Sequence, residues 1–243
     1  MSHHKLGRLP IKRDHRTLTL SKYTRMLALA PPPVSCPPPN LQWPMNLNDR
    51  ISDCTIAGAA HCIELWSAAI NTPKVLSDDQ VLTAYEQLSG YNQAVQGSDN
   101  GCYMINVLNT WSTSGIASDT LAGFVALNIT DLNEIKDAIN WFGCAYIGLN
   151  LPESADQNVN LWDVVPGSPI SGGHCVIIVG YDEQLFYIVS WGMLIPATPA
   201  FISTYMEEAY ALLSKDFINV TGTTPQGIDW TNLQTDISQI RTS

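Results

Sequence analysis

The pattern of apolar residues changes near residue 143, and this change limits the possible fold more than any other feature. Before it, four segments have the length and spacing of helices: about 54–70, from 77 onward, about 103–113 and about 131–142. After it come three short β-branched and aromatic runs: "CAYIGLNL" (144–151), "HCVIIVGY" (174–181) and "FYIVSW" (186–191). Helices that precede strands predict an α+β protein, in which a helical half meets a sheet half.

Capping residues support the helical half. Ser52 or Asp53 is placed to accept hydrogen bonds from the first free amides of the helix that begins near residue 54. "SDDQ", from Ser77, and "DLNE", from Asp131, have the spacing of capping boxes. Beyond the strands, we expect a late helix at about 199–214 and an amphipathic tail helix at about 229–240.

Basic residues are concentrated at the amino-terminal end. Residues 1–45 hold seven of the twelve Lys and Arg but only one acid, so the rest of the chain carries five bases and 21 acids. Because phosphate contacts need clustered Lys and Arg, this acidic body is not expected to bind nucleic acid. The basic arm is either a strap that docks on the acidic body or a contact for an anionic surface.

A run of prolines ends this arm. "PPPVSCPPP" (31–39) predicts a stiff, extended connector, because proline fixes its own backbone and keeps the preceding residue out of the helical region. A proline-rich docking motif is the alternative interpretation. The chain therefore divides into an arm with its connector over residues 1–40 and a folded domain over 41–243.

The sequence predicts a soluble, cytoplasmic protein. No segment near the start joins a basic stretch to a long apolar run, and no apolar stretch approaches the roughly 18 residues of a membrane span. The six cysteines form no CxxC pair, and the Cys and His residues lack the close pairing of tetrahedral metal sites. We therefore expect no disulfide scaffold, no metal, no cofactor and no membrane partner.

Cys54 and His174 are the residues best placed for nucleophilic chemistry. Cys54 lies in the first turn of its helix, where free amides and the helix dipole favour a thiolate, although a lone cysteine there is more often an inert small residue. His61 cannot activate it, because seven helical residues separate the two by about 10 Å. His174 follows two glycines at the start of a strand, and a base for Cys54 must come from such a distant segment.

The order of motifs resembles that of the papain-like cysteine peptidases over roughly residues 42–195. Asn48 stands six residues before Cys54, where the family has a glutamine. The other segments that are similar to family motifs are "LSDDQVLTAY" (76–85), "DNGCYMINVLNTWSTSGI" (99–116), "DLNEIKDAINWFGCAYIGLNL" (131–151), "GGHCVIIVGYD" (172–182) and "YIVSWGM" (187–193). The resemblance implies a two-lobe fold with a helical half at about 45–125, built on the helix of Cys54, and an antiparallel sheet half at about 126–243.

The resemblance also implies roles for individual residues. Cys54 would be the nucleophile and His174 the base, on opposite walls of a cleft, and Asn48 would help to bind the oxyanion. The implied substrate-binding residues are Gly101, Cys102, Tyr103, Met104, Gly173 and Trp191, the last also shielding the histidine.

The chain departs from the family at several of these positions. Val189 stands where the family has the asparagine that orients the histidine, so Ser190 or Asp182 is expected to take over this role. Asp53 adds a negative charge beside the nucleophile. The side chain of Cys102 is expected to intrude where the family pairs with an extended peptide, and the arm does not resemble the family's inhibitory propeptide.

Three hypotheses follow for the function. In the first, an enzyme hydrolyses an amide, peptide or ester bond, or transfers its acyl group, through an acyl-thioester on Cys54. In the second, a catalytically weak or inactive papain-like scaffold binds a peptide or protein partner in its cleft. In the third, Cys54 forms a disulfide, with Cys102 as the natural partner.

Overall fold

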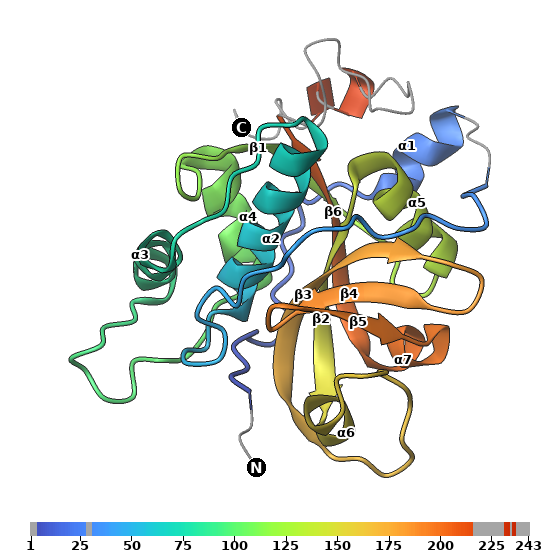
Figure 1. Cartoon of the computed structure of the whole chain (residues 1–243). Coiled ribbons are helices and arrows are strands. Elements are labelled where there is room, and N and C mark those ends of the chain that lie inside the picture. Colours follow the sequence, from blue (N-terminus) through green and yellow to red (C-terminus); the bar gives the residue numbers. More distant parts are fainter. Residues whose placement is uncertain (1–3, 28–30, 216–230, 234, 237–243) are drawn as a thin grey trace.

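A computed structural model describes residues 4–27, 31–215, 231–233 and 235–236 (Figure 1). Its centre is a six-stranded antiparallel sheet in the order β1-β6-β2-β3-β4-β5. The strands are β1 (Leu121–Ala126), β2 (Ala145–Pro152), β3 (Ile170–Tyr181), β4 (Phe186–Ser190), β5 (Met193–Ala197) and β6 (Met206–Ser214). The predicted α+β class is confirmed, and the three predicted strands are β2, β3 and β4.

Helices cover both faces of this sheet. They are α1 (Leu20–Leu27), α2 (Cys54–Ala69), α3 (Asp78–Ser89), α4 (Met104–Thr113), α5 (Leu132–Phe142), α6 (Glu153–Gln157) and α7 (Pro199–Tyr205). Figure 1 shows α2, α3 and α4 on one side of the sheet, with α5 and α7 on the other. Within the described residues, no helix has the length and apolar character that a membrane crossing requires.

Strand β3 separates two hydrophobic cores. Val176 and Ile178 face a core that includes α5 and α7, whereas Ile177 and Val179 face a core built with α2, α3 and α4. Successive side chains of a strand point to opposite faces, so a strand covered on both sides must be apolar at nearly every position. This explains the unbroken apolar run "CVIIV" in the middle of β3.

Helix α2 is buried almost all round, and its small residues allow the sheet to approach closely. A Cβ on Gly58 would lie only 3.0 Å from the ring of Tyr146. The hydroxyl of Tyr146 donates a hydrogen bond to the carbonyl of Thr55 over 2.7 Å. A helix that is apolar on every side is stable only inside a core. The packing therefore fixes the first turn of α2, with Cys54, at the junction of helices and sheet.

The helix-start signals are partly confirmed. Ser77 forms the complete capping box at α3, and Asp131 caps α5 by accepting from the amide of Asn133. At α2, Asp53 occupies the cap position but makes no side-chain hydrogen bond to the helix. Its carboxylate instead accepts a hydrogen bond from Asn48.

The predicted late helix is wrong in its second half. Helix α7 ends at Tyr205, and Met206–Ser214 is strand β6, which lies between β1 and β2. A central strand with both faces covered reads as a continuous apolar run, and "AYALL" in this segment cannot be told from a buried helix by periodicity. The predicted tail helix at 229–240 falls mostly outside the described residues.

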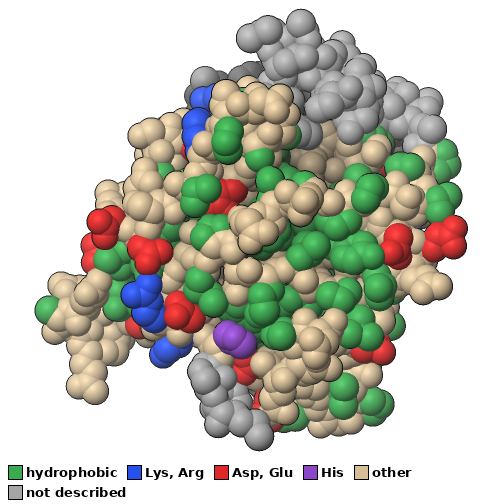
Figure 2. All heavy atoms as spheres, viewed as in Figure 1, with side chains coloured by type: hydrophobic (Ala, Val, Ile, Leu, Met, Phe, Trp, Pro, Cys, Tyr) green, Lys and Arg blue, Asp and Glu red, His purple; other side chains and the backbone are tan. Residues whose placement is uncertain are grey.

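The amino-terminal arm packs along the body. Residues 4–9 run between the start of α2 and strand β3. Further on, the carbonyl of Leu18 accepts a hydrogen bond from the amide of Ala126 in β1. Cys36 exchanges two backbone hydrogen bonds with Tyr181 at the end of β3. Of the two alternatives for the arm, the strap is the one that the structure contains. Figure 2 shows charged side chains of both signs scattered over this face rather than gathered into one patch.

Candidate active site

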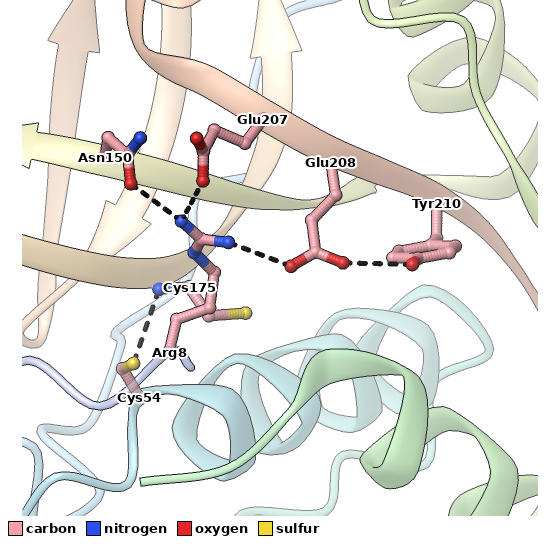
Figure 3. Close-up of polar contacts among 7 residues, drawn as sticks. All are labelled: Arg8, Cys54, Asn150, Cys175, Glu207, Glu208 and Tyr210. Atoms are coloured by element: carbon pink, nitrogen blue, oxygen red, sulfur yellow. Dashed lines mark hydrogen bonds and ion pairs between the residues drawn. The ribbon is translucent and has the colours of Figure 1, made fainter. Parts of the chain in front are cut away.

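Cys54 is fully buried at the first residue of α2. The amide of Cys175, in β3, donates a hydrogen bond to its sulfur over 3.3 Å (Figure 3). Burial raises the pKa of Cys54 to about 12, although the backbone amides of Cys175 and Gly7 at the sulfur lower it. Because Cys175 directly follows His174, the same contact brings the strand of the histidine to the thiol.

His174 is held from two sides. Its Nε2 lies 2.8 Å from the hydroxyl oxygen of Ser190, and its ring stacks on Trp191 with the ring centroids 4.7 Å apart. Its Nδ1 is buried and has no hydrogen-bond partner among the described residues. Burial lowers the pKa of His174 to about 3, and the nearby His4 adds to this effect. With the arm in place, both the imidazole and the thiol are therefore neutral.

Of the two residues expected to orient the histidine, Ser190 is the one that contacts it. Asp182 lies beyond the far end of β3, where its carboxylate accepts from the hydroxyl of Tyr187 and from the amide of Leu185. Val189 is buried and pairs with Ile177 in the sheet. The serine hydroxyl thus lies one residue after the position at which the family carries its asparagine.

Asn48 lies beside the start of α2. Its amide nitrogen donates to Asp53 over 3.1 Å and lies 3.5 Å from the carbonyl oxygen of Lys5 in the arm. Burial raises the pKa of Asp53 well above its usual range, although the hydrogen bond from Asn48 opposes this. A carboxyl that favours its neutral form opposes a neighbouring thiolate less than an ionised one does. The side chain of Asn48 therefore contacts the residue that directly precedes Cys54.

The predicted substrate loop pairs with the arm through its backbone. The amide of Cys102 donates to the carbonyl of Gly7 over 2.9 Å, and the amide of Leu9 donates to the carbonyl of Cys102 over 3.0 Å. The side chain of Cys102 does not intrude into this space, contrary to expectation, because it is buried against Thr55. The backbone at Cys102 therefore pairs with an extended segment, which in this structure is residues 7–9 of the arm.

The other predicted substrate-binding residues lie around the same segment of the arm. Gly173 accepts a hydrogen bond from the amide of Arg8 over 3.0 Å. Gly101 precedes this pairing with a left-handed backbone, and Tyr103 faces the ammonium of Lys12. Met104 is buried at the first residue of α4.

The arm closes the cleft with residues 4–9. Gly7 passes so close to the body that a Cβ on it would lie 1.8 Å from the backbone oxygen of Ser52. At one end, the ring of His4 stacks on Trp191 at 4.0 Å between centroids, and its Nδ1 lies 2.8 Å from Asp156. At the other end, Arg8 forms a parallel bridge with Cys102. The arm thus runs from the side of Trp191 to the side of Cys102, directly over Cys54.

Sequence reasoning missed two parts of this site. One is the arm itself, and the other is the pair Glu207 and Glu208, which bind Arg8. The concentration of basic residues in residues 1–45 indicates that the arm docks on the acidic body, but it does not predict where on the body it docks. All six cysteines are free thiols, so Cys54 has no disulfide partner. Among the described residues, no three His, Cys, Asp or Glu side chains gather as metal ligands would.

Comparisons with known proteins find similarity in structure alone. No protein-family model and no curated protein matches the sequence. Xylellain, a cysteine protease from Xylella fastidiosa, matches with a TM-score of 0.69 and 14% identity, over 88% of this chain and 97% of that one. A digestive procathepsin L 3 from Tenebrio molitor matches with a TM-score of 0.58 and 14% identity, over 87% and 76%. A cysteine protease from Carica candamarcensis matches with a TM-score of 0.53 and 14% identity, over 75% and 99%.

At 14% identity, these structures establish the arrangement of the chain and not its chemistry. The protein has the papain-like fold, with Cys54 and His174 at the junction of its helices and sheet.

Proposed function

We propose that this protein is a cysteine hydrolase or acyltransferase that acts on an amide, peptide or ester bond through an acyl-thioester on Cys54. The observation that carries the proposal is the setting of His174. Its Nε2 lies at hydrogen-bond distance from Ser190, and its ring stacks on Trp191. Its buried Nδ1 has no hydrogen-bond partner among the described residues. The next residue of the same strand, Cys175, donates its amide to the sulfur of Cys54. A base oriented by a third group next to a nucleophile is the arrangement that covalent catalysis requires.

The reaction follows from these positions. Nδ1 of His174 takes the thiol proton as the sulfur of Cys54 attacks the carbonyl carbon of the substrate. The backbone amide of Cys54 and the side-chain amide of Asn48 stabilise the oxyanion, and one such donor is worth about 2.7 to 4 kcal/mol in other enzymes. The imidazolium then protonates the leaving amine or alcohol, which leaves an acyl-thioester. Water or an acceptor nucleophile, deprotonated by His174, releases the acyl group and restores the thiol.

This reaction needs the arm to leave the cleft. Cys54 has no exposed surface while residues 4–9 are docked, and an amide of Gly7, rather than a carbonyl carbon, meets its sulfur. The carbonyl of Gly7 is turned away and accepts from Cys102. The docked arm is therefore an occupant that the thiol cannot attack.

Thiol reactivity and turnover test the proposal. We expect the full-length Gly7→Ala variant, whose arm cannot dock in the same way, to hydrolyse blocked peptide esters and to react with iodoacetamide at Cys54 faster than at Cys102. Cys54→Ala and His174→Ala in this background should abolish turnover, and Cys36→Ser, at a partly exposed cysteine outside the cleft, should preserve it. Turnover that survives Cys54→Ala would refute the proposed nucleophile.

A second candidate function is supported by the docked state itself. Burial gives a neutral thiol and a neutral imidazole, and the cleft already holds a peptide segment, as a binding scaffold would. Such a scaffold would bind peptides with equal affinity before and after His174→Ala, and its Cys54 would stay slow to alkylate when the arm is displaced. The two candidates therefore give opposite results in the same Gly7→Ala variant.

A further inference from the structure

Asp99 joins the two loops that border the cleft beside Cys54. Its Oδ1 accepts one hydrogen bond from the amide of Ser52 over 2.9 Å and another from the hydroxyl of Tyr85 over 2.6 Å. The oxygen of Tyr85, in α3, accepts in turn from the amide of Gly101 over 2.9 Å. One carboxylate oxygen therefore connects a residue just before the thiol with the loop that is predicted to bind substrate.

Both loops border the same narrow slot. A Cβ on Gly7 of the arm would meet the backbone oxygen of Ser52, and a Cβ on Gly101 would meet the carbonyl oxygen of Gly7. The neighbours of these loop residues are groups that the proposed reaction uses. The amide of Cys54 binds the oxyanion, and the backbone of Cys102 pairs with an extended segment. The distance between Ser52 and Gly101 therefore determines how these two groups lie relative to each other.

The loop between α3 and α4 also contains hydrogen bonds within itself. The hydroxyl of Ser98 accepts from the amide of Asn92 over 3.1 Å and donates to the carbonyl of Asn92 over 2.9 Å. These bonds hold the shape of residues 92–98 but do not reach α2. At the start of α2, the cap residue Asp53 makes no side-chain hydrogen bond to the helix. Asp99, directly after this segment, makes the connection to the residues that precede α2.

The connection is buried on its tyrosine side. Tyr85 has no exposed surface and Gly101 is buried, whereas Asp99 is half-buried. Burial raises the pKa of Tyr85, and the hydrogen bond to Asp99 raises it further, so the hydroxyl keeps its proton and donates it to the carboxylate oxygen. A buried amide without an acceptor is unfavourable, which favours the loop position in which Gly101 bonds to Tyr85.

We propose that Asp99 is a positioning residue of the proposed active site. Through Ser52 it places the amide of Cys54 that binds the oxyanion, and through Tyr85 it places the backbone that pairs with the substrate. The inference rests on the proposed function and adds a residue that controls turnover and substrate binding through separate contacts. Removing the tyrosine hydroxyl releases only Gly101, whereas removing the carboxylate releases Ser52 and also loosens the tyrosine. Asparagine keeps an oxygen in the same place, which accepts both hydrogen bonds.

Steady-state kinetics with a blocked peptide ester separates the two contacts in the full-length Gly7→Ala background. Tyr85→Phe should raise KM about tenfold and change kcat by less than about twofold, because only the substrate-pairing loop is released. Asp99→Ala should raise KM and also lower kcat about tenfold, because the oxyanion-binding amide is released as well. Asp99→Asn should restore both constants to within about threefold. Glu86→Ala, which removes an exposed carboxylate next to Tyr85 in α3, should leave both constants unchanged.

Amide hydrogen exchange, measured by NMR on the same variants, tests the connection without turnover. Asp99→Ala should accelerate exchange at the amides of Ser52 and Gly101. Tyr85→Phe should accelerate it at Gly101 alone, and Asp99→Asn at neither amide.

The outcomes are distinct. Asp99→Asn as impaired as Asp99→Ala, or Tyr85→Phe with the same loss of kcat as Asp99→Ala, overturns the positioning role. If Asp99→Ala does not fold, Tyr85→Phe decides alone, and an unchanged KM overturns the proposal. The expected exchange pattern, with no turnover in the Gly7→Ala protein itself, overturns the proposed function and leaves the connection through Asp99 standing.

Discussion

Replacing Arg8 by alanine should open the cleft. In the docked arm, Arg8 makes one hydrogen bond to the buried Glu208, one to the more exposed Glu207 and one to Asn150. A hydrogen bond to a buried charged group contributes roughly 1.5 to 3 kcal/mol, and the more exposed contact contributes less because solvent screens it. In the variant, docking also leaves Glu208 buried without its cation. We therefore expect docking to weaken by about 3 kcal/mol, which is on the order of 100-fold in the open fraction.

Alkylation of Cys54 measures this fraction directly. Cys54 is fully buried when the arm is docked, so iodoacetamide reacts only with the open form. When docking is fast compared with alkylation, the rate of labelling is proportional to the open population. Mass spectrometry of the peptide that carries Cys54 should therefore give labelling on the order of 100-fold faster in Arg8→Ala than in the unmodified chain.

Two controls separate arm opening from general loosening. Lys12→Ala removes a charge from the same arm at an exposed residue that contacts Asn106 and the ring of Tyr103, and should change labelling by no more than about twofold. Cys62, buried in α2, reports on opening of the core. Labelling of Cys54 in Arg8→Ala that is no faster than in Lys12→Ala, or that rises together with that of Cys62, would contradict the reasoning.

Three further perturbations give separate results. Gly7→Ala should also accelerate labelling of Cys54, because its Cβ meets the backbone of Ser52, while urea unfolding of the body stays unchanged; slow labelling would show that the arm docks by other contacts. Ser190→Ala in the Gly7→Ala background should lower kcat by about tenfold, the value of one lost hydrogen bond to His174, and Ser190→Thr should restore it; equal kcat values would remove Ser190 from the mechanism. Burial raises the pKa of Glu64 to about 8, so the folded protein keeps a proton that the unfolded chain releases above pH 4.5. The unfolding free energy should therefore fall as pH rises from 4.5 to about 8, by about 1.4 kcal/mol per pH unit from this group, and urea titrations at pH 5 and 8 should show that Glu64→Gln removes this slope. Identical pH slopes for the two proteins would exclude a protonated Glu64.

The parts of the site that sequence reasoning located have local signals. Cys54 stands at the first turn of a helix whose small residues are visible in the sequence, and His174 follows two glycines in an apolar strand. The sequence offers Ser190 only as one of two candidates, because Asp182, directly after β3, is also near His174 in the chain. Only the direction of β3 separates them, since it carries Asp182 away from His174.

The parts that sequence reasoning missed depend on tertiary packing. Strand β6 reads as the continuation of a helix, because a strand covered on both faces loses the alternation that identifies strands. This error concealed the contacts of Arg8, since Glu207 and Glu208 meet its guanidinium at a register shift between β2 and β6 next to Gly148. The docking of the arm has no local signal either. Glycine is a common residue in loops, so Gly7 gives no specific signal. Its close approach to the backbone of Ser52 exists only in the folded chain.

The covalent link between the arm and the body gives the closed cleft a distinctive concentration dependence. A separate peptide with the contacts of residues 4–9 would dissociate and be diluted, but a tethered segment returns at an effective concentration fixed by the chain that joins it. The fraction of molecules with a closed cleft is therefore independent of the protein concentration. A substrate competes with the arm at the same effective concentration in every solution. Cutting the chain between Leu9 and Thr19 would change only this effective concentration. The same contacts would then have to form between two molecules, and in dilute solution the cleft would stay open.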